Sequence, residues 1–195
     1  MGQDLNAICV FCGASDSADP ALLAAAAQLG LNLAREQLAL VYGGGGVGLM
    51  GACALAAHQA GGKVLGVIPN FLKVRERRLD VVETIVVESM HERKMIMFER
   101  ADGFAILPGG IGTLEEVVEL LSWRRLDLHA KPVVFYNPGG FWNPLFALFQ
   151  HTVDHRLTPP EFMKSWATVD QIDDVIPTLR ELASASQISI DVARL

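Results

Sequence analysis

The chain has 195 residues, of which 51% are hydrophobic, and a formal net charge of −6 at neutral pH. This length suits one well-buried core rather than two, so we expect a single domain over residues 1–195, with a partly mobile tail from about Ala183. The net negative charge argues against a nucleic-acid partner, because nucleic-acid-binding proteins usually carry a basic face and this chain has only one short basic run. No apolar run approaches the ~20 residues of a membrane span, so we expect no membrane association.

Cysteine usage indicates a reducing compartment. The three cysteines, Cys9, Cys12 and Cys53, are an odd number, and the N-terminus lacks a basic region followed by an apolar one, which predicts reduced thiols in a cytoplasmic protein. Cys9 and Cys12 form a C-x-x-C pattern, but in a strand-like run this spacing places the two side chains on opposite faces. We therefore expect no redox pair, no metal and no cofactor.

Strand-like and helix-like stretches alternate along the chain. Apolar runs bounded by glycine turns predict strands at 7–11, 37–42, 63–68, 81–88, 103–107 and 131–136. Helical spacing and capping residues predict helices over 21–36, from the second glycine run to about 59, over 89–100, from 111 onward, and over 143–154 and 172–182. Ser89 and Glu92 have the spacing of a capping box at the start of the helix over 89–100. This alternation predicts an α/β, Rossmann-like fold in three layers, an open, mostly parallel sheet with helices on both faces.

The stretch Pro108–Glu116, of sequence PGGIGTLEE, joins a buried strand to a helix. Its three glycines allow positive φ and a close approach of the backbone to a ligand, while the free N–H groups of a helix's first turn favour an anion. Two carboxylates lie on the same first turn. The stretch therefore predicts a phosphate cradle and chemistry on a phosphorylated small molecule. The alternative is a capping box from Thr113 to Glu116, although capping alone does not require Gly-Gly-x-Gly.

A second glycine run, Gly43–Gly51, also follows a strand and opens a helix. Its last six residues fit G-x-G-x-x-G, but a dinucleotide site also needs an acid near the end of the next strand, where Pro69 and Asn70 stand. We therefore expect a second backbone loop lining the same crevice rather than an NAD site. The chain has no G-x-x-x-x-G-K-[ST] segment, which excludes a P-loop ATPase.

The motifs together resemble those of the Lonely Guy family of cytokinin riboside 5′-monophosphate phosphoribohydrolases. The family pattern P-G-G-x-G-T-x-x-E is similar to Pro108–Glu116, and M-H-x-R-K is similar to Met90–Lys94. Tyr42–Gly51 and Phe11–Ser15 also resemble family sequences. The resemblance implies a Rossmann-like homodimer that hydrolyses the N-glycosidic bond of AMP or N6-prenylated AMP, giving free base and ribose 5-phosphate. The residues leave open which of the two is the substrate.

The resemblance also implies roles for single residues. Arg93 and Glu116 correspond to the catalytic pair, and Glu76 is the nearest candidate for a glutamate that plant members carry before the M-H-x-R-K helix. The implied substrate-binding residues are Lys94, Gly109, Gly110, Ile111, Gly112, Thr113, Glu115, Gly44, Gly45 and Ser15. The chemistry fits independently, because cleavage of a ribosyl C–N bond passes through an oxocarbenium-like state that a carboxylate and a forked cation can serve.

Two other functions use the same residues. A nucleotide or cofactor carrier would bind through the same loops without turnover. A pyridoxal-phosphate lysine decarboxylase would need a Schiff-base lysine, and only Lys94 lies near the motif. Apolar residues at Trp123, Leu126 and Leu128, beyond the face needed to cover one sheet, support the expected homodimer.

Overall fold

One seven-stranded sheet forms the centre of the computed structural model, which describes residues 5–192 and the side chains of residues 5–185. Its strands are β1 (Ala7–Phe11), β2 (Ala39–Tyr42), β3 (Val64–Pro69), β4 (Glu83–Val87), β5 (Gly103–Ile106), β6 (Val133–Tyr136) and β7 (Ala167–Val169). The strand order is β4-β3-β2-β1-β5-β6-β7, and every pairing is parallel. The predicted Rossmann-like sheet is confirmed.

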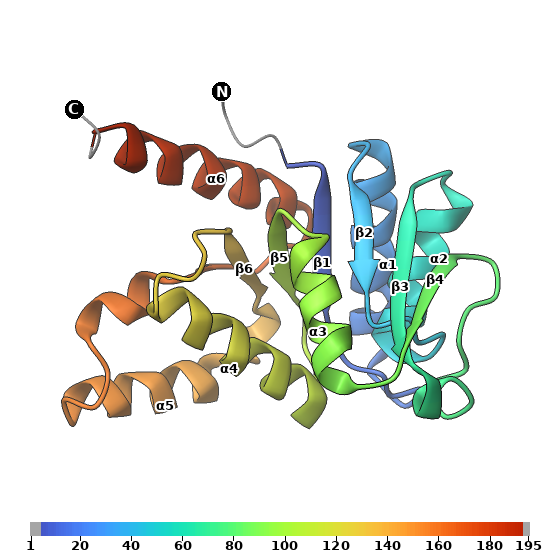
Figure 1. Cartoon of the computed structure of the whole chain (residues 1–195), viewed down its shortest axis with the longest axis horizontal. Helices are drawn as coiled ribbons and strands as arrows, with labels where there is room; N and C mark the ends of the chain where they lie inside the picture. Colours follow the sequence, from blue (N-terminus) through green and yellow to red (C-terminus); the bar gives the residue numbers. More distant parts are fainter. Residues whose placement is uncertain (1–4, 193–195) are drawn as a thin grey trace.

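Helices cover both faces of the sheet, which confirms the three-layer prediction (Figure 1). They are α1 (Pro20–Arg35), α2 (Gly48–Gln59), α3 (Met90–Glu99), α4 (Ile111–Arg125), α5 (Asn143–Asp154) and α6 (Val175–Val192). Side chains of α1, α2 and α6 pack into the core on one face, whereas those of α3, α4 and α5 pack on the other. None of the helices in the described part of the chain is long and apolar enough to cross a membrane.

Small residues bring α1 and α2 close together. A Cβ atom built at Gly30 of α1 would lie 2.1 Å from the carbonyl oxygen of Cys53 in α2, so only glycine fits there. Ala26 and Ala57 are buried in the same core. The small side chains of α1 thus allow this helix to pack closely against α2.

The cysteines lie as the strand pattern predicts. Cys9 packs into the core on the face of α3 and α4, whereas Cys12 packs with Cys53 into the core on the opposite face. All three are buried and free of disulfides. Burial raises the pKa of the Cys9 and Cys12 thiols above the ordinary value, and raises that of Cys53 to about 12, so these thiols are protonated at neutral pH.

Two parts of the C-terminal region differ from the prediction. The three-residue edge strand β7 was not predicted, because so short a segment carries no usable alternation. The last helix does not end near Leu182 but continues to Val192, so the expected tail from Ala183 is helical as far as it is described. Residues 193–195, and residues 1–4 at the other end, lie outside the described residues.

The topology places three loops at one end of the sheet. The chain runs outward from β1 to β4 and then returns to the other side of β1 with β5, which makes the β1/β5 boundary the topological switch point. Gly13, after β1, donates from its N–H to the carbonyl of Pro108 after β5 at 3.0 Å, and its own carbonyl accepts from the N–H of Leu49 at 3.0 Å. The loops after β1, β2 and β5 are therefore joined to one another.

Candidate active site

A cavity of about 150 Å³ lies at the switch point, where these three loops meet. It is lined by residues from five segments of the chain: Cys12, Gly13, Ala14, Met50, Glu76, Arg93, Gly110, Gly112, Thr113 and Glu116. Five predicted site residues, Arg93, Glu116, Gly110, Gly112 and Thr113, are thus brought together. The two predicted motifs meet in one place, although they are far apart in sequence.

The start of α4 forms one wall of the cavity. Its N-cap is Gly110, and no side chain caps its first turn. Thr113 and Glu116 therefore lie inside the helix, so the alternative of a capping box between them is wrong. Because the first N–H groups of a helix have no partner within the helix, α4 offers free donors and the positive end of its dipole to a ligand.

The glycines of this turn are needed because they lack a side chain, not because they have unusual backbone angles. The expected positive φ is not found at Gly109, Gly110 or Gly112; Gly110 has φ −97°. A Cβ at Gly109 would lie 2.1 Å from Oγ1 of the buried Thr113, whereas a Cβ at Gly110 or Gly112 would meet nothing within 4 Å. The last two glycines therefore leave open space beside the helix start, where a ligand can approach the backbone.

Arg93 reaches the cavity from inside the protein. The residue is only 4% exposed, so it is not a solvated helix arginine. Nε donates to the carbonyl of Val67 in β3 at 3.2 Å, and Nη2 donates to the carbonyl of Gly43 at 2.9 Å. A Cβ at Gly43 would lie 2.0 Å from Nη2, so glycine is required there to admit the guanidinium. Two backbone carbonyls thus fix the position of this cation.

The capped start of α3 places Arg93 one turn into that helix. Oγ of Ser89 accepts from the N–H of Glu92 at 3.1 Å, as the predicted capping box requires. The carboxylate of Glu92 accepts from the N–H of Glu88 at 3.1 Å rather than from that of Ser89. The N-cap half of the predicted capping box is confirmed, whereas the returning hydrogen bond comes from the residue before the N-cap.

Glu116 is a carboxyl group held partly protonated at neutral pH. Burial raises its pKa to about 7; Arg93 opposes this rise, while Glu115 and Glu76 add to it. The structure shows no direct ion pair between Arg93 and Glu116, although both line the same cavity. A carboxyl group with a pKa near neutrality is suited to proton transfer.

Glu76 is a second carboxyl group in the cavity. Its Oε2 lies 3.8 Å from Nη2 of Arg93 and is buried without a hydrogen-bond partner among the described residues. Burial raises the pKa of Glu76, and Arg93 opposes the rise. The sequence identified Glu76 only as the nearest candidate in its loop, and the structure places it beside Arg93. This carboxylate oxygen is ion-paired with Arg93 but accepts no hydrogen bond within the described part of the chain, so it can accept one from a ligand hydroxyl or amine.

The other predicted binding residues do not line the cavity. Lys94 forms ion pairs with Glu115 and with Glu119, the second at 2.8 Å, and so links α3 to α4. Burial lowers the pKa of Lys94, but the two carboxylates outweigh it and raise the value overall. Ile111 is 84% exposed and Ser15 is also exposed, with its Oγ accepting from the N–H of Ser17 at 3.3 Å.

Three predicted glycines support the cavity rather than line it. Gly44 has φ 78° and packs against Ile68, and a Cβ at Gly45 would lie 3.2 Å from Oε2 of Glu76. Gly109 makes room for Thr113. Four lining residues, Cys12, Gly13, Ala14 and Met50, were not predicted to bind. Their position after β1 and at the start of α2 would have identified them, because ligands bind at the strand ends beside a switch point.

Fold and site together define a class of protein: a Rossmann-like α/β protein with an anion-binding helix start, a buried arginine and two carboxyl groups at its switch point. A family model described as "Possible lysine decarboxylase" matches residues 50–179. The cytokinin riboside 5′-monophosphate phosphoribohydrolase LOG7 of Arabidopsis thaliana is 41% identical over 175 residues, which cover 89% of this chain and 81% of the relative. LOG2 of the same plant is 45% identical over 148 residues, covering 75% and 70%. The chain belongs to this Lonely Guy (LOG) family.

A solved structure of a molybdenum cofactor binding protein from Rippkaea orientalis shares the fold. It superposes with a TM-score of 0.68 at 24% identity, covering 92% of this chain and 98% of the other. At this identity the likeness concerns the fold alone.

Proposed function

We propose that the protein hydrolyses the N-glycosidic bond of adenine-type nucleoside 5′-monophosphates, AMP or N6-prenylated AMP, and releases free base and ribose 5-phosphate. The observation that carries this proposal is the meeting of Glu116, with its pKa raised to about 7, and the buried Arg93 at the uncapped start of α4. The names of the LOG relatives support the same reaction.

In the proposed reaction the 5′-phosphate binds at the start of α4. The open space beside Gly110 and Gly112 lets phosphate oxygens approach the free N–H groups of the helix. This contact holds the ribose so that its C1′ lies near Glu116. The cavity of about 150 Å³ is smaller than the ~300 Å³ of typical ligand sites, so it holds the phosphate and ribose while the base extends beyond it.

Glu116 and Arg93 then serve different parts of the transition state. As the bond from C1′ to the base nitrogen breaks, positive charge develops on the ribose, and ionised Glu116 stabilises it. Water adds its oxygen to C1′ and gives a proton to Glu116, which passes this proton to the ring nitrogen of the leaving base and is ionised again. Arg93, fixed by two carbonyls, presents its remaining donors to the ribose or phosphate, and Oε2 of Glu76 accepts from a ribose hydroxyl.

The test compares AMP, N6-prenylated AMP and adenosine with the purified protein, measuring free base and ribose 5-phosphate. Release of both products from either nucleotide supports the proposal. Tight AMP binding without turnover would instead support the carrier alternative. For a lysine decarboxylase, the lysine geometry is unfavourable: no lysine lines the described cavity, and the nearby Lys94 is held by two glutamates.

The proposal includes a homodimer located in the cytoplasm. Apolar side chains lie exposed along α4 and just after it: Ile111 is 84% exposed, Val118 44%, Leu126 58% and Leu128 66%. An apolar helix face of this kind is typical of a contact between subunits. Three buried free cysteines fit a reducing compartment.

A further inference from the structure

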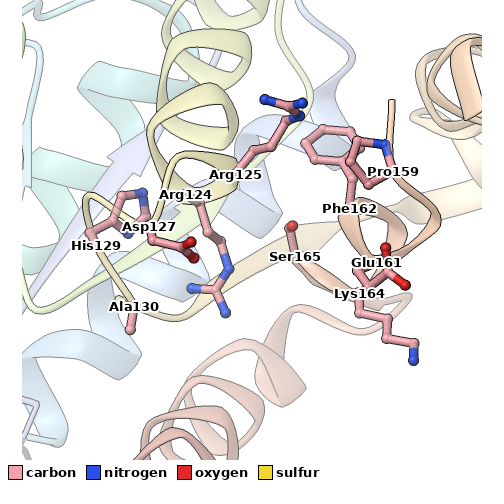
Figure 2. Close-up of a pocket in the computed structure, with 10 residues that line it drawn as sticks. All are labelled: Arg124, Arg125, Asp127, His129, Ala130, Pro159, Glu161, Phe162, Lys164 and Ser165. Carbon is pink, nitrogen blue, oxygen red and sulfur yellow. The ribbon is translucent and has the colours of Figure 1, made fainter. Parts of the chain in front are cut away.

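A second, larger cavity lies at the other end of α4 (Figure 2). Its volume is about 410 Å³, within the range of small-molecule sites. It lies between the last turn of α4, the loop that follows, and the segment around Phe162: the lining residues are Arg124, Arg125, Asp127, His129, Ala130, Pro159, Glu161, Phe162, Lys164 and Ser165. Helix α4 has 15 residues, so about 22 Å separates this cavity from the start of the helix.

Two arginines of α4 line this cavity, with their guanidinium groups directed to opposite sides of it (Figure 2). Arg124 is half-buried and anchored, since its Nη1 donates to the carbonyl of Lys131 at 2.6 Å. Burial lowers the pKa of Arg124, as expected for a cation removed from water without a countercharge. Among the described side chains, Arg124, Arg125 and Lys164 form no ion pair. A guanidinium without a carboxylate partner keeps the donors that the Lys131 contact does not use, and these are available to an anion.

The remaining lining residues define what could accompany such an anion. Ser165, a buried residue, points its hydroxyl into the gap between the two arginines and Phe162 (Figure 2). Phe162 and Pro159 form an apolar wall opposite α4. The acidic residues, Asp127 and Glu161, are exposed and lie on opposite sides of the gap, with Glu161 beside Lys164.

His129 contributes no charge to the cavity. Its Nε2 lies 3.0 Å from the carbonyl of Leu120, so this nitrogen is the donor. Burial lowers the pKa of His129; the Leu120 hydrogen bond opposes the shift, and the positive charges of Arg124 and Lys131 add to it. Burial, more than the neighbouring cations, therefore keeps His129 neutral.

We propose that this cavity binds a small ligand that carries an oxyanion on a flat apolar group, with the oxyanion held by Arg124 and Ser165, the positive charge of Arg125 nearby, and the flat group lying on Phe162. The forked donors of arginine match both phosphate and carboxylate, so the ligand class includes aryl phosphates and aryl carboxylates. The site is separate from the nucleotide cavity and does not depend on the proposed reaction.

The experiment uses the full-length protein, labelled with ¹⁵N, and follows its amide signals during titration with phenyl phosphate, benzoate and benzyl alcohol. Phenyl phosphate and benzoate should shift the amides of Asp127, Ala130 and Ser165 in a saturable way, and benzyl alcohol should not. A response to phenyl phosphate alone would assign the site to phosphates. Equal binding of benzyl alcohol, or no saturable shift at these amides, would overturn the proposal.

Variants separate this cavity from the nucleotide site. Arg124→Gln should weaken binding about tenfold, because it removes a charged donor, and Arg125→Gln, an exposed change, should weaken it less, because it removes only a nearby charge. Arg124→Lys keeps the charge but loses the fork and should lie between wild type and Arg124→Gln. The matched control is Arg100→Gln, an exposed arginine at the end of α3, which should bind like wild type. Unchanged binding by both Gln variants, with the fold verified by thermal unfolding, would contradict the assignment.

Discussion

Replacement of Glu116 by Gln should stabilise the protein above neutral pH while lowering its turnover. Burial raises the pKa of Glu116 from the ordinary 4.5 to about 7, so the folded protein disfavours the ionised form by roughly 3 kcal/mol. The stabilising contribution of this carboxyl is fully present below pH 4.5 and is lost as pH rises through about 7. Gln is neutral at every pH and nearly the same size. Above neutrality, Glu116→Gln should therefore raise the free energy of unfolding by up to roughly 3 kcal/mol, and near pH 4 it should change little.

Turnover should move in the opposite direction. Gln cannot stabilise the oxocarbenium charge or accept a proton from water, so the kcat for AMP should fall on the order of 100-fold or more. AMP affinity should stay the same or improve, because a negative charge near the phosphate is removed. Arg93→Ala provides a contrast, since the loss of a forked cation should harm both binding and turnover.

Urea unfolding at pH 4 and pH 8, at one fixed protein concentration, measures the stability change, and release of base measures kcat. Glu99→Gln is the matched control, because Glu99 is exposed at the end of α3 and should alter neither quantity. Near-normal hydrolysis by Glu116→Gln would refute the catalytic assignment. Equal stability changes at both pH values would refute the raised pKa.

Four further predictions follow from the site. Adenosine should be a poor substrate in the product assay, because it lacks the phosphate that the start of α4 binds; comparable cleavage of AMP and adenosine would remove that role. The kcat/KM for AMP should rise with pH through about 7, since the active Glu116 is ionised, and a profile that falls through this range would assign it the role of an acid. Gly43→Ala should lower kcat/KM at least tenfold, because a Cβ there lies 2.0 Å from Nη2 of Arg93; an unchanged value would show that this guanidinium position is unimportant. Light scattering should give twice the chain mass at micromolar concentration, and Leu126→Glu should weaken that dimer, whereas a monomer mass for the wild type would disprove it.

The sequence predicted those parts of the molecule that depend on local pattern. The alternation of strands and helices predicted the parallel sheet and its two helical layers, and the capping residue Ser89 predicted the start of α3. The sequence did not predict features that depend on contacts between residues far apart in the chain. The spacing from Thr113 to Glu116 left a capping box open as an alternative, but the helix begins at Ile111 with Gly110 as its N-cap, and Thr113 lies inside it against Gly109.

The sequence also could not predict which individual side chains are buried. Arg93 lies on a short, polar helix, and only the gap at Gly43 and the carbonyl of Val67 show why it points inward. Lys94, the next residue, matches the family motif equally well but is held by Glu115 and Glu119 away from the cavity. Adjacent motif residues can thus differ in role because a helix turns them to different neighbours.

The hydrogen bonds of Gly13 constrain how this site can change over evolution. Its links to Pro108 and Leu49 hold three loops in one rigid frame, so a substitution that shifts one loop disturbs the other two. The segment carrying Glu76 is joined to that frame through the N–H of Gly46, which donates to the carbonyl of Glu76 at 2.8 Å, and through the exposed ion pair of Arg77 with Asp16. Because one of these two contacts is only an exposed ion pair, we expect substitutions that change substrate preference to occur around Glu76. We expect the three loops that hold the phosphate to vary less.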